Sequence, residues 1–298
     1  MSTNPIVVGY DGSAGARAAL GWALDEGART GAPVTLMFVF EWLTVAGPIA
    51  PGPRSWPDHG FREDAQNLVD AAVTEAFRSH PAVAVTGDVV GGSPAVILRE
   101  RSRDARLMVM GSRGQGGFAD LLLGSTTVAV SAHAHCPVVV VPAAKTDEEQ
   151  GGERPDGPVV AGVDGSDCAQ LALGYAFEQA AGRHARLRVV RAWAPPAPRW
   201  RPSGYDLEEQ ATAERVELDE LVAGWRGKYP EVEVSVDVVT GPAGSVMVDA
   251  TRGAQLVVVG SRGLGGFRGL LLGSVSQQLL HHAHCPVAVV RELPAVAG

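Results

Sequence analysis

One stretch of fifteen residues occurs twice in the chain, and this duplication restricts the folds that the sequence can adopt. The first copy, Gly111 to Ser125, reads GSRGQGGFADLLLGS, and the second, Gly260 to Ser274, reads GSRGLGGFRGLLLGS. Twelve of the fifteen positions are identical. A chain of 298 residues has the length of two ordinary domains. The sequence therefore predicts two similar halves, each with one copy of the same site.

The residues around each copy indicate a phosphate-binding turn. A short apolar run precedes each copy, Leu107 to Met110 in the first half and Leu256 to Val259 in the second, and is typical of a buried parallel strand. A helical pattern begins after the closing Gly-Ser pair. Glycines let the backbone come close to an anion, and the N–H groups of a helix start point toward it. We therefore expect each stretch to hold the phosphate tail of a nucleotide.

Each half repeats one order of predicted elements. A first apolar strand ends in Asp-Gly-Ser, and an amphipathic helix follows that closes at a glycine-bearing turn near Gly31 or Gly182. Four more strands then alternate with three more helices. The expected strands are Ile6–Tyr10, Val34–Phe40, Val83–Val90, Leu107–Met110 and Val138–Val141, then Val159–Val163, Leu187–Trp193, Val232–Val239, Leu256–Val259 and Val287–Val290. The helices before and after each third strand are expected at about 62–79, 95–103, 207–228 and 245–252.

This alternation predicts an α/β fold with two tandem open five-stranded parallel sheets, each with helices on both faces. In such sheets ligands bind beyond the carboxyl ends of the strands, where the strand order reverses. Asp11 and Gly111 follow two strands of the first half, as Asp164 and Gly260 do in the second. If the first and fourth strands are neighbours, the carboxylate and the glycine-rich turn share one crevice.

The domain boundaries follow from the repeat and from a change in composition. We expect a first domain at residues 1–144 and a second at residues 158–298. Residues 145–157 between them are polar and rich in proline, glycine and glutamate, which is typical of an exposed linker.

Bulk composition and net charge limit the classes of protein to which the chain can belong. Apolar residues make up 46% of the chain and charged residues 19%, which is enough for two packed cores. The net charge is 25 − 33 = −8, so the chain lacks the basic character of a nucleic-acid or anionic-membrane binder. There is no signal-peptide pattern and no apolar run of membrane-spanning length. Three cysteines are too few for a disulfide framework, so a cytoplasmic protein is predicted.

Two common phosphate motifs do not explain the glycine-rich stretch. The P-loop pattern is absent, because the Gly227-Lys228 pair is followed by Tyr229. The dinucleotide pattern G-x-G-x-x-[GA] occurs in the first copy, but the second copy has Arg268 at its third position. Neither copy follows the first strand of its half, as that pattern requires.

A third spacing fits both copies, namely G-x2-G-x9-G-S. With the aspartate after the first strand and the Cys-Pro before the last one, this spacing makes the sequence resemble the universal stress protein family, in its ATP-binding, tandem two-domain form. The resemblance covers nearly all of both halves. It implies a Rossmann-like, adenine nucleotide alpha hydrolase-like fold, in which the last strands, Val138–Val141 and Val287–Val290, pair antiparallel and make the chain a pseudo-dimer.

The resemblance also implies one ATP site per domain, and bound ATP normally brings Mg²⁺ with it. The opening aspartate would contact the nucleoside, Val39 or Ala192 would lie against the adenine, and the glycine positions would hold ribose and phosphates. Thr126 in one copy is Val275 in the other, so the affinities can differ. The predicted site residues are Asp11, Val39, Met110, Gly111, Arg113, Gly114, Gly124, Ser125 and Thr126 in the first half, and Asp164, Ala192, Val259, Gly260, Arg262, Gly263, Gly273, Ser274 and Val275 in the second.

Several of these residues have simpler interpretations. The aspartates could only cap the first helix of each half. The loop arginines, Arg113 and Arg262, could be solvated and not paired with phosphate oxygens. The repeated His-Ala-His-Cys motif offers three metal ligands without a fourth, so a structural turn is favoured and no metal site is predicted.

No catalytic signature accompanies the nucleotide site. G-x-S-x-G is absent, and neither glycine-rich stretch contains a lysine that could stabilise a transferring phosphoryl group. The resemblance therefore implies a nucleotide-responsive regulator in stress adaptation or growth control, with at most slow ATP hydrolysis, a homodimer of tandem chains and an unidentified protein partner. Two alternatives stay open: a weak ATP-hydrolysing or adenylyl-transferring enzyme of the same architecture, and a nucleotide-free interaction module.

Overall fold

A computed structural model describes residues 4–41, 58–115, 123–143, 156–196, 199, 204, 206–265 and 272–291. The chain divides into two compact units, Met1–Cys136 and Pro137–Gly298. Most of the predicted linker, 145–157, lies outside the described residues, so the domain boundaries stay a prediction.

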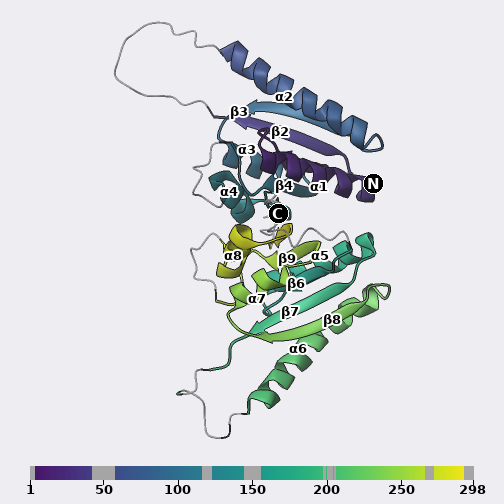
Figure 1. The fold of residues 1–298 in the computed structure, drawn as a ribbon, viewed down its shortest axis with the longest axis vertical. Coiled ribbons are helices and arrows are strands. Elements are labelled where there is room, and N and C mark those ends of the chain that lie inside the picture. Colours follow the sequence, from purple (N-terminus) through teal and green to yellow (C-terminus); the bar gives the residue numbers. More distant parts are fainter. Residues whose placement is uncertain are drawn as a thin grey trace, which may run out of the picture. The chain divides into compact units, whose positions relative to one another are not determined.

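The first unit contains a parallel sheet in the order β3-β2-β1-β4. Helices α1 and α2 cover one face of this sheet, and α3 and α4 cover the other (Figure 1). The strands are β1 (Ile6–Gly9), β2 (Val34–Phe40), β3 (Val85–Gly91) and β4 (Leu107–Gly111). The helices are α1 (Ala14–Thr30), α2 (Asp58–Ser79), α3 (Pro94–Arg101) and α4 (Ser125–His133).

The second unit repeats this arrangement in the order β10-β9-β6-β7-β8, again with parallel pairs. Helices α5 and α6 correspond to α1 and α2, and α7 and α8 to α3 and α4 (Figure 1). The strands are β6 (Val159–Gly162), β7 (Leu187–Trp193), β8 (Val234–Thr240), β9 (Leu256–Gly260) and β10 (Val287–Val290). The helices are α5 (Asp167–Arg183), α6 (Leu207–Lys228), α7 (Ala243–Ala250) and α8 (Ser274–His282).

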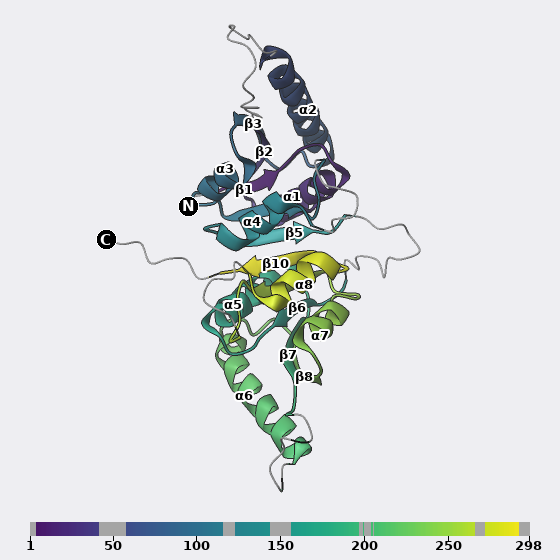
Figure 2. The same cartoon turned by 90° about the vertical axis from the view of Figure 1, so that its left-hand side faces the viewer.

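One more strand joins the sheet of the second unit. It is β5 (Val138–Val141), which precedes the linker in the sequence and pairs antiparallel with β10, so that Val139 faces Ala288 (Figure 2). The antiparallel pairing that the resemblance implies for these two strands is confirmed.

The predicted fold class is confirmed, and the reason is visible in the burial of the strands. Helices cover both faces of each sheet, so successive residues of a central strand are buried whichever way they point. Val257 and Val258, for example, are both fully buried although their side chains lie on opposite faces of β9. Unbroken apolar runs are therefore the pattern that this fold requires.

Some element boundaries differ from those predicted. Strands β3 and β8 begin two residues later than expected, and α3 and α7 begin and end earlier. Helices α1 and α5 end near Gly31 and Gly182 as predicted, and Gly31 takes the left-handed conformation after α1. In the second unit Gly182 is helical, and His184 takes that conformation instead, with φ 52°. A non-glycine residue costs about 1–2 kcal/mol in this conformation, which is why a glycine was expected there.

Among the described residues, no helix combines the length and the apolar character that a membrane crossing requires.

Candidate functional site

The site in each unit begins at a reversal of strand order. Strand β1 lies between β2 and β4, and β6 lies between β7 and β9, so the first and fourth strands are neighbours as the site requires. The second strand lies on one side of the first strand, and the fourth strand lies on its other side. This reversal opens a crevice at the carboxyl ends of the first and fourth strands. The aspartate and the glycine-rich turn both start at that edge.

In the first unit, Asp11 connects the two parts of the crevice. Its Oδ1 accepts a hydrogen bond from the backbone N–H of Ser13 at 2.9 Å, and its Oδ2 accepts one from the N–H of Gln115 at 2.7 Å. The side chain of Ser13, and not the aspartate, caps α1 by accepting from Ala16 N–H at 3.1 Å. The interpretation of the aspartate as a simple helix cap is therefore wrong; it tethers the glycine-rich turn.

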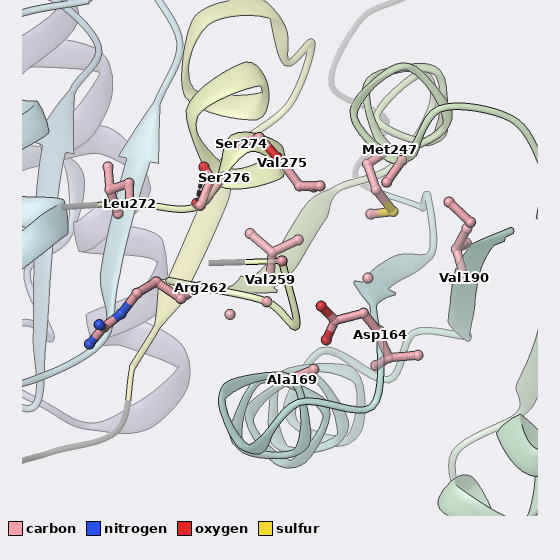
Figure 3. A pocket seen from close by; sticks show the side chains of 18 residues that line it. Asp164, Ala169, Val190, Met247, Val259, Arg262, Leu272, Ser274, Val275 and Ser276 are labelled. Carbon is pink, nitrogen blue, oxygen red and sulfur yellow. Dashed lines mark hydrogen bonds between the residues drawn. The ribbon is translucent and has the colours of Figure 1, made fainter. Parts of the chain in front are cut away.

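The second unit repeats the tether. Asp164 accepts from Ser166 N–H through Oδ1 at 3.0 Å and from Leu264 N–H through Oδ2 at 2.8 Å. Ser166 caps α5 by accepting from Ala169 N–H at 3.3 Å. Figure 3 shows the Asp164 carboxylate directed toward the glycine-rich turn, with α5 below it.

The glycines of the turn are required by close contacts within the protein. A Cβ on Gly114 would collide with the Asp11 carboxylate, and a Cβ on Gly263 would collide with that of Asp164. A Cβ on Gly111 would lie 2.5 Å from a backbone carbon of α1. The absence of side chains thus lets the aspartate and α1 reach the turn, in addition to leaving room for a ligand.

The helix that follows the turn starts without a side-chain cap. Gly124 and Gly273 occupy the N-cap positions of α4 and α8, so neither supplies an acceptor for the first amides of its helix. The hydroxyl groups of Thr127 and Ser276 instead donate back into the turn, to Gly111 O at 2.9 Å and to Gly273 O at 2.9 Å. The first-turn amides therefore offer donors to an anion at the crevice.

A cavity of about 440 Å³ opens from the crevice of the second unit (Figure 3). All nine residues predicted for the second site line it, although the Arg262 side chain is exposed and extends away from its centre. The start of α8 with Ser274 lies at one side of the cavity, and Val190 and Met247 lie across from it, with the Asp164 carboxylate near Val190 (Figure 3). The volume lies within the range of small-molecule sites, about 300–1,000 Å³.

Sequence reasoning missed several lining residues. Val190 could have been found, because it lies two positions before Ala192 on β7 and so on the same face. Met247 and Ala243 of α7 had no signal in the sequence, because their role depends on where that helix crosses the sheet. The other lining residues that were not predicted are Gly162, Val163, Ala169, Gly265, Leu272 and Ser276.

The first unit places its predicted residues in the same way. Strand β1 pairs with β2 in the register in which β6 pairs with β7, so Val39 occupies the place of Ala192. Met110 and Gly111 end β4 as Val259 and Gly260 end β9, and the other residues predicted for the glycine-rich stretch follow β4 or begin α4, as their counterparts follow β9 or begin α8. Arg113 is exposed. The ligand role of all these residues stays a prediction.

Comparison with known proteins identifies the family. A model of the universal stress protein family matches residues 3–142 and again residues 157–291. The chain belongs to the universal stress protein family. The resemblance seen in the sequence is thereby confirmed, with two family domains in tandem.

Relatives of this universal stress protein match it along almost its whole length. Universal stress protein Rv2623 of Mycobacterium tuberculosis is 37% identical over 302 residues, which cover 96% of each chain. Universal stress protein Rv2005c of the same organism is 36% identical over 291 residues, covering 96% of this chain and 97% of the relative. A solved universal stress protein structure from Archaeoglobus fulgidus covers 98% of this chain and 99% of its own, with a TM-score of 0.70 and 21% identity, and so supports the fold.

The repeated His-Ala-His-Cys motif of this universal stress protein lies in a packed turn. Cys136 and Cys285 are buried, and desolvation raises the pKa of the Cys136 thiol to about 12. His133 Nδ1 lies 2.9 Å from Ala129 O, and the backbone N–H of His135 donates to Ser102 Oγ at 2.7 Å. Within the described ranges, no group of three His, Cys, Asp or Glu side chains could hold a metal ion. These contacts favour the structural interpretation of the motif.

Proposed function

We propose that this universal stress protein binds ATP and acts as a nucleotide-responsive regulator, with one nucleotide site in each unit. The observation that carries the proposal is the cavity of the second unit, which has an uncapped helix start at one end and an apolar wall at the other. A nucleotide has the same polarity, with phosphates at one end and a flat, largely apolar base at the other.

The phosphate end would be held by backbone amides. A helix start contributes roughly 0.3–2 kcal/mol to anion binding, and a hydrogen bond to a charged group about 1.5–3 kcal/mol. Micromolar affinity needs about 8 kcal/mol, so several donors must converge. Gly263 and Gly265 after β9 and Gly273 and Ser274 at the start of α8 line the same cavity, so their amides are candidates for such donors. Mg²⁺ would bind phosphate oxygens and water, as it does with nucleotides generally.

The base end would be held by apolar side chains. Val190 and Ala192 come from β7, Val259 from β9 and Met247 from α7, and all four line the cavity. Burial of a base against these groups adds affinity in proportion to the apolar area removed from water.

A regulatory role is favoured over catalysis by what the turn contains. Neither glycine-rich stretch has a lysine, and both oxygens of the Asp164 carboxylate accept hydrogen bonds from backbone amides. A carboxylate that already holds the turn in place is suited to transmit occupancy of the site to the loop. The cytoplasmic location, the homodimer and the protein partner stay predictions.

The test is direct measurement of nucleotide binding. Freshly purified protein is denatured, and the released small molecules are identified by mass spectrometry. Folded protein from which the nucleotide has been removed is titrated with ATP by calorimetry. We expect ATP in the released fraction and a measurable dissociation constant, both lost in the chain with Gly114→Glu and Gly263→Glu. Gly21→Ala, in α1 with open space around it, is the matched control. Retained ATP binding in the double variant would refute the site assignment.

A further inference from the structure

Residues of β7 alternate between the cavity of the second unit and helix α6. Val190 and Ala192 line the cavity, whereas Arg191 between them points to the opposite face of the strand. There Arg191 Nη1 lies 3.0 Å from Glu214 Oε2 and 3.1 Å from Glu217 Oε2, and both glutamates belong to α6. The same segment of β7 thus lines the cavity on one face and joins an ion-pair cluster, Arg191 with the two glutamates, on the other.

The guanidinium of this ion-pair cluster also lies against the Asp-Gly-Ser turn. A Cβ on Gly165 would lie 3.7 Å from Arg191 Nη2, which is an ordinary van der Waals distance, and Gly165 lies between Asp164 and Ser166. Arg191 is 9% exposed, and its Nε is buried without a hydrogen-bond partner among the described residues. The position of the guanidinium therefore depends on the ion pairs at Nη1, and the guanidinium supports the turn that carries Asp164.

The first unit has apolar residues at all three positions of the ion-pair cluster. Phe38 takes the place of Arg191, because β1–β2 and β6–β7 pair in equivalent registers. Ala65 and Leu68, the eighth and eleventh residues of α2, take the places of the two glutamates in α6. Leu68 also reaches the first turn, since a Cβ on Gly12 would lie 2.7 Å from its Cδ1. The support beneath the turn is therefore apolar in the first unit and ionic in the second.

The glycine-rich turns, by contrast, are alike. They agree at twelve of fifteen positions, and both units have the aspartate tether and the glycine N-cap. Exposed Arg17 donates a hydrogen bond to Gly12 O in the first unit, but a carbonyl oxygen carries no net charge that salt could screen. Salt should therefore screen a bound phosphate tail to a similar extent in both sites. A difference in salt response between the two sites would come from the support beneath the turn.

We infer that Arg191 is a positioning residue for the second site and makes nucleotide binding there more dependent on ionic strength than in the first unit. This inference rests on the proposed nucleotide-binding function. The side chain of Glu217 is 69% exposed, so dissolved ions reach its carboxylate and weaken its attraction to Arg191. A guanidinium that is held less firmly leaves the turn with Asp164 less firmly fixed. Binding must then order the turn, and this ordering lowers the affinity.

Salt titration of each site in the full chain tests the inference. Gly114→Glu leaves the second site and Gly263→Glu leaves the first, and each chain is titrated with ATP by calorimetry at about 0.05 M and about 0.5 M KCl, where the Debye lengths differ about threefold. We expect salt to weaken the second site about threefold more than the first, which is the size of effect of a partly exposed ion pair. Equal weakening of both sites would overturn the inference and leave the proposed function standing. Absence of ATP binding in these chains and in the unmodified chain would refute the proposed function with it.

Substitutions in the ion-pair cluster test the cause, in the chain that keeps only the second site. Arg191→Met leaves two carboxylates without their cation and should weaken ATP binding at low salt at least threefold. The triple variant Arg191→Phe, Glu214→Ala, Glu217→Leu carries the residues of the first unit, so it should restore the affinity to within threefold and remove the additional salt dependence. Arg226→Met breaks another ion pair of α6 and, as the control, should keep that dependence. A triple variant that keeps the full salt dependence would overturn the role of the cluster.

Hydrogen exchange in the ligand-free chain tests the support of the turn without any nucleotide and without a glycine variant. The backbone N–H groups of Ser13 and Ser166 donate equivalent hydrogen bonds to the two aspartates, at 2.9 Å and 3.0 Å. The same increase in KCl should speed exchange at the Ser166 amide about threefold more than at the Ser13 amide. Glu217→Gln, at an exposed position, should remove this difference. Equal effects of salt on the two amides would overturn the inference, whether or not ATP binds.

Discussion

At the scale of single residues, Asp11 and Asp164 hold the site together. Each carboxylate joins the turn after the first strand to the turn after the fourth, and each contacts a position that only glycine can occupy. The glycine and the aspartate therefore depend on each other, because a methyl group on the glycine would displace the carboxylate. In the proposed nucleotide site, the amides that donate to its oxygens would offset part of the negative charge of the carboxylate.

We expect Asp164→Asn to loosen the second site. Asparagine has one acceptor oxygen, so either Ser166 N–H or Leu264 N–H loses its partner. Loss of one such hydrogen bond should weaken ATP binding roughly threefold to tenfold and speed hydrogen exchange at the Leu264 amide. Asp167→Asn, an equal charge change at the exposed first residue of α5, is the control. Unchanged exchange at Leu264 would contradict the tether.

The buried thiol of Cys136 gives a pH-dependent prediction. Burial raises its pKa from about 9 to about 12, so the thiol ionises first in the unfolded chain. The folded state then binds more protons, and the free energy of unfolding falls as the pH rises from 9 toward 12. Urea unfolding at pH 8 and pH 10.5 should show this loss, and Cys136→Ala should show less of it. Equal pH dependence in the two proteins would contradict the burial of this thiol.

At the scale of elements, the two units support the Asp-Gly-Ser turn by different means. A Cβ on Gly12, which has φ 77°, would lie 2.7 Å from Leu68 Cδ1 of α2. The eleventh residue of α2 is Leu68, and the eleventh residue of α6 is Glu217. In the second unit Arg191 of β7 lies under the turn, with its Nη1 3.0 Å from Glu214 and 3.1 Å from Glu217. The Asp-Gly-Ser turn thus lies against an apolar side chain in the first unit and against an ion-pair cluster in the second.

We expect Arg191→Met to destabilise the second unit in a salt-dependent manner. The Arg191 side chain is 10% exposed, whereas that of Glu217 is 69% exposed and can be hydrated again. The loss should therefore be about 1–3 kcal/mol, below the 3–5 kcal/mol of a fully buried pair. Urea unfolding at low and high NaCl measures it, because the gap to the unmodified chain should narrow at high salt. Arg78→Met, which breaks an exposed pair with Glu75, should change stability by less than about 1 kcal/mol. Equal effects of the two substitutions would contradict the buried role of Arg191.

At the scale of the whole molecule, strand β5 completes the sheet of the second unit although it precedes the linker in sequence. It pairs antiparallel with β10 and places Val139 opposite Ala288, both fully buried. Such a pairing of distant segments makes the stability of the second unit depend on residues of the first repeat.

A size exchange tests this pairing. Val139→Ala should cost about 2 kcal/mol through the cavity that it leaves, and Ala288→Val about 1–3 kcal/mol through overpacking. Because the two residues face each other, the double variant should recover most of the loss, with a coupling energy of at least about 1 kcal/mol. Urea unfolding of the four proteins measures that energy. Additive losses would contradict the register.

The sequence by itself determined the features that depend on local pattern. The duplicated turn predicted two domains, the apolar runs predicted parallel strands, and the glycine spacing led to the residues that line the cavity of the second unit. These inferences succeed because strand burial, glycine conformations and helix starts are properties of a few neighbouring residues.

Only the tertiary structure decided which distant groups meet. The sequence was compatible with Asp164 as a helix cap, and only the structure shows its hydrogen bond with Leu264. No sequence pattern indicated that Met247 lines the cavity or that Arg191 lies beside the Asp-Gly-Ser turn. Contacts of this kind follow from the distances at which helices and sheets pack, and those distances are set by the whole core and not by any single segment.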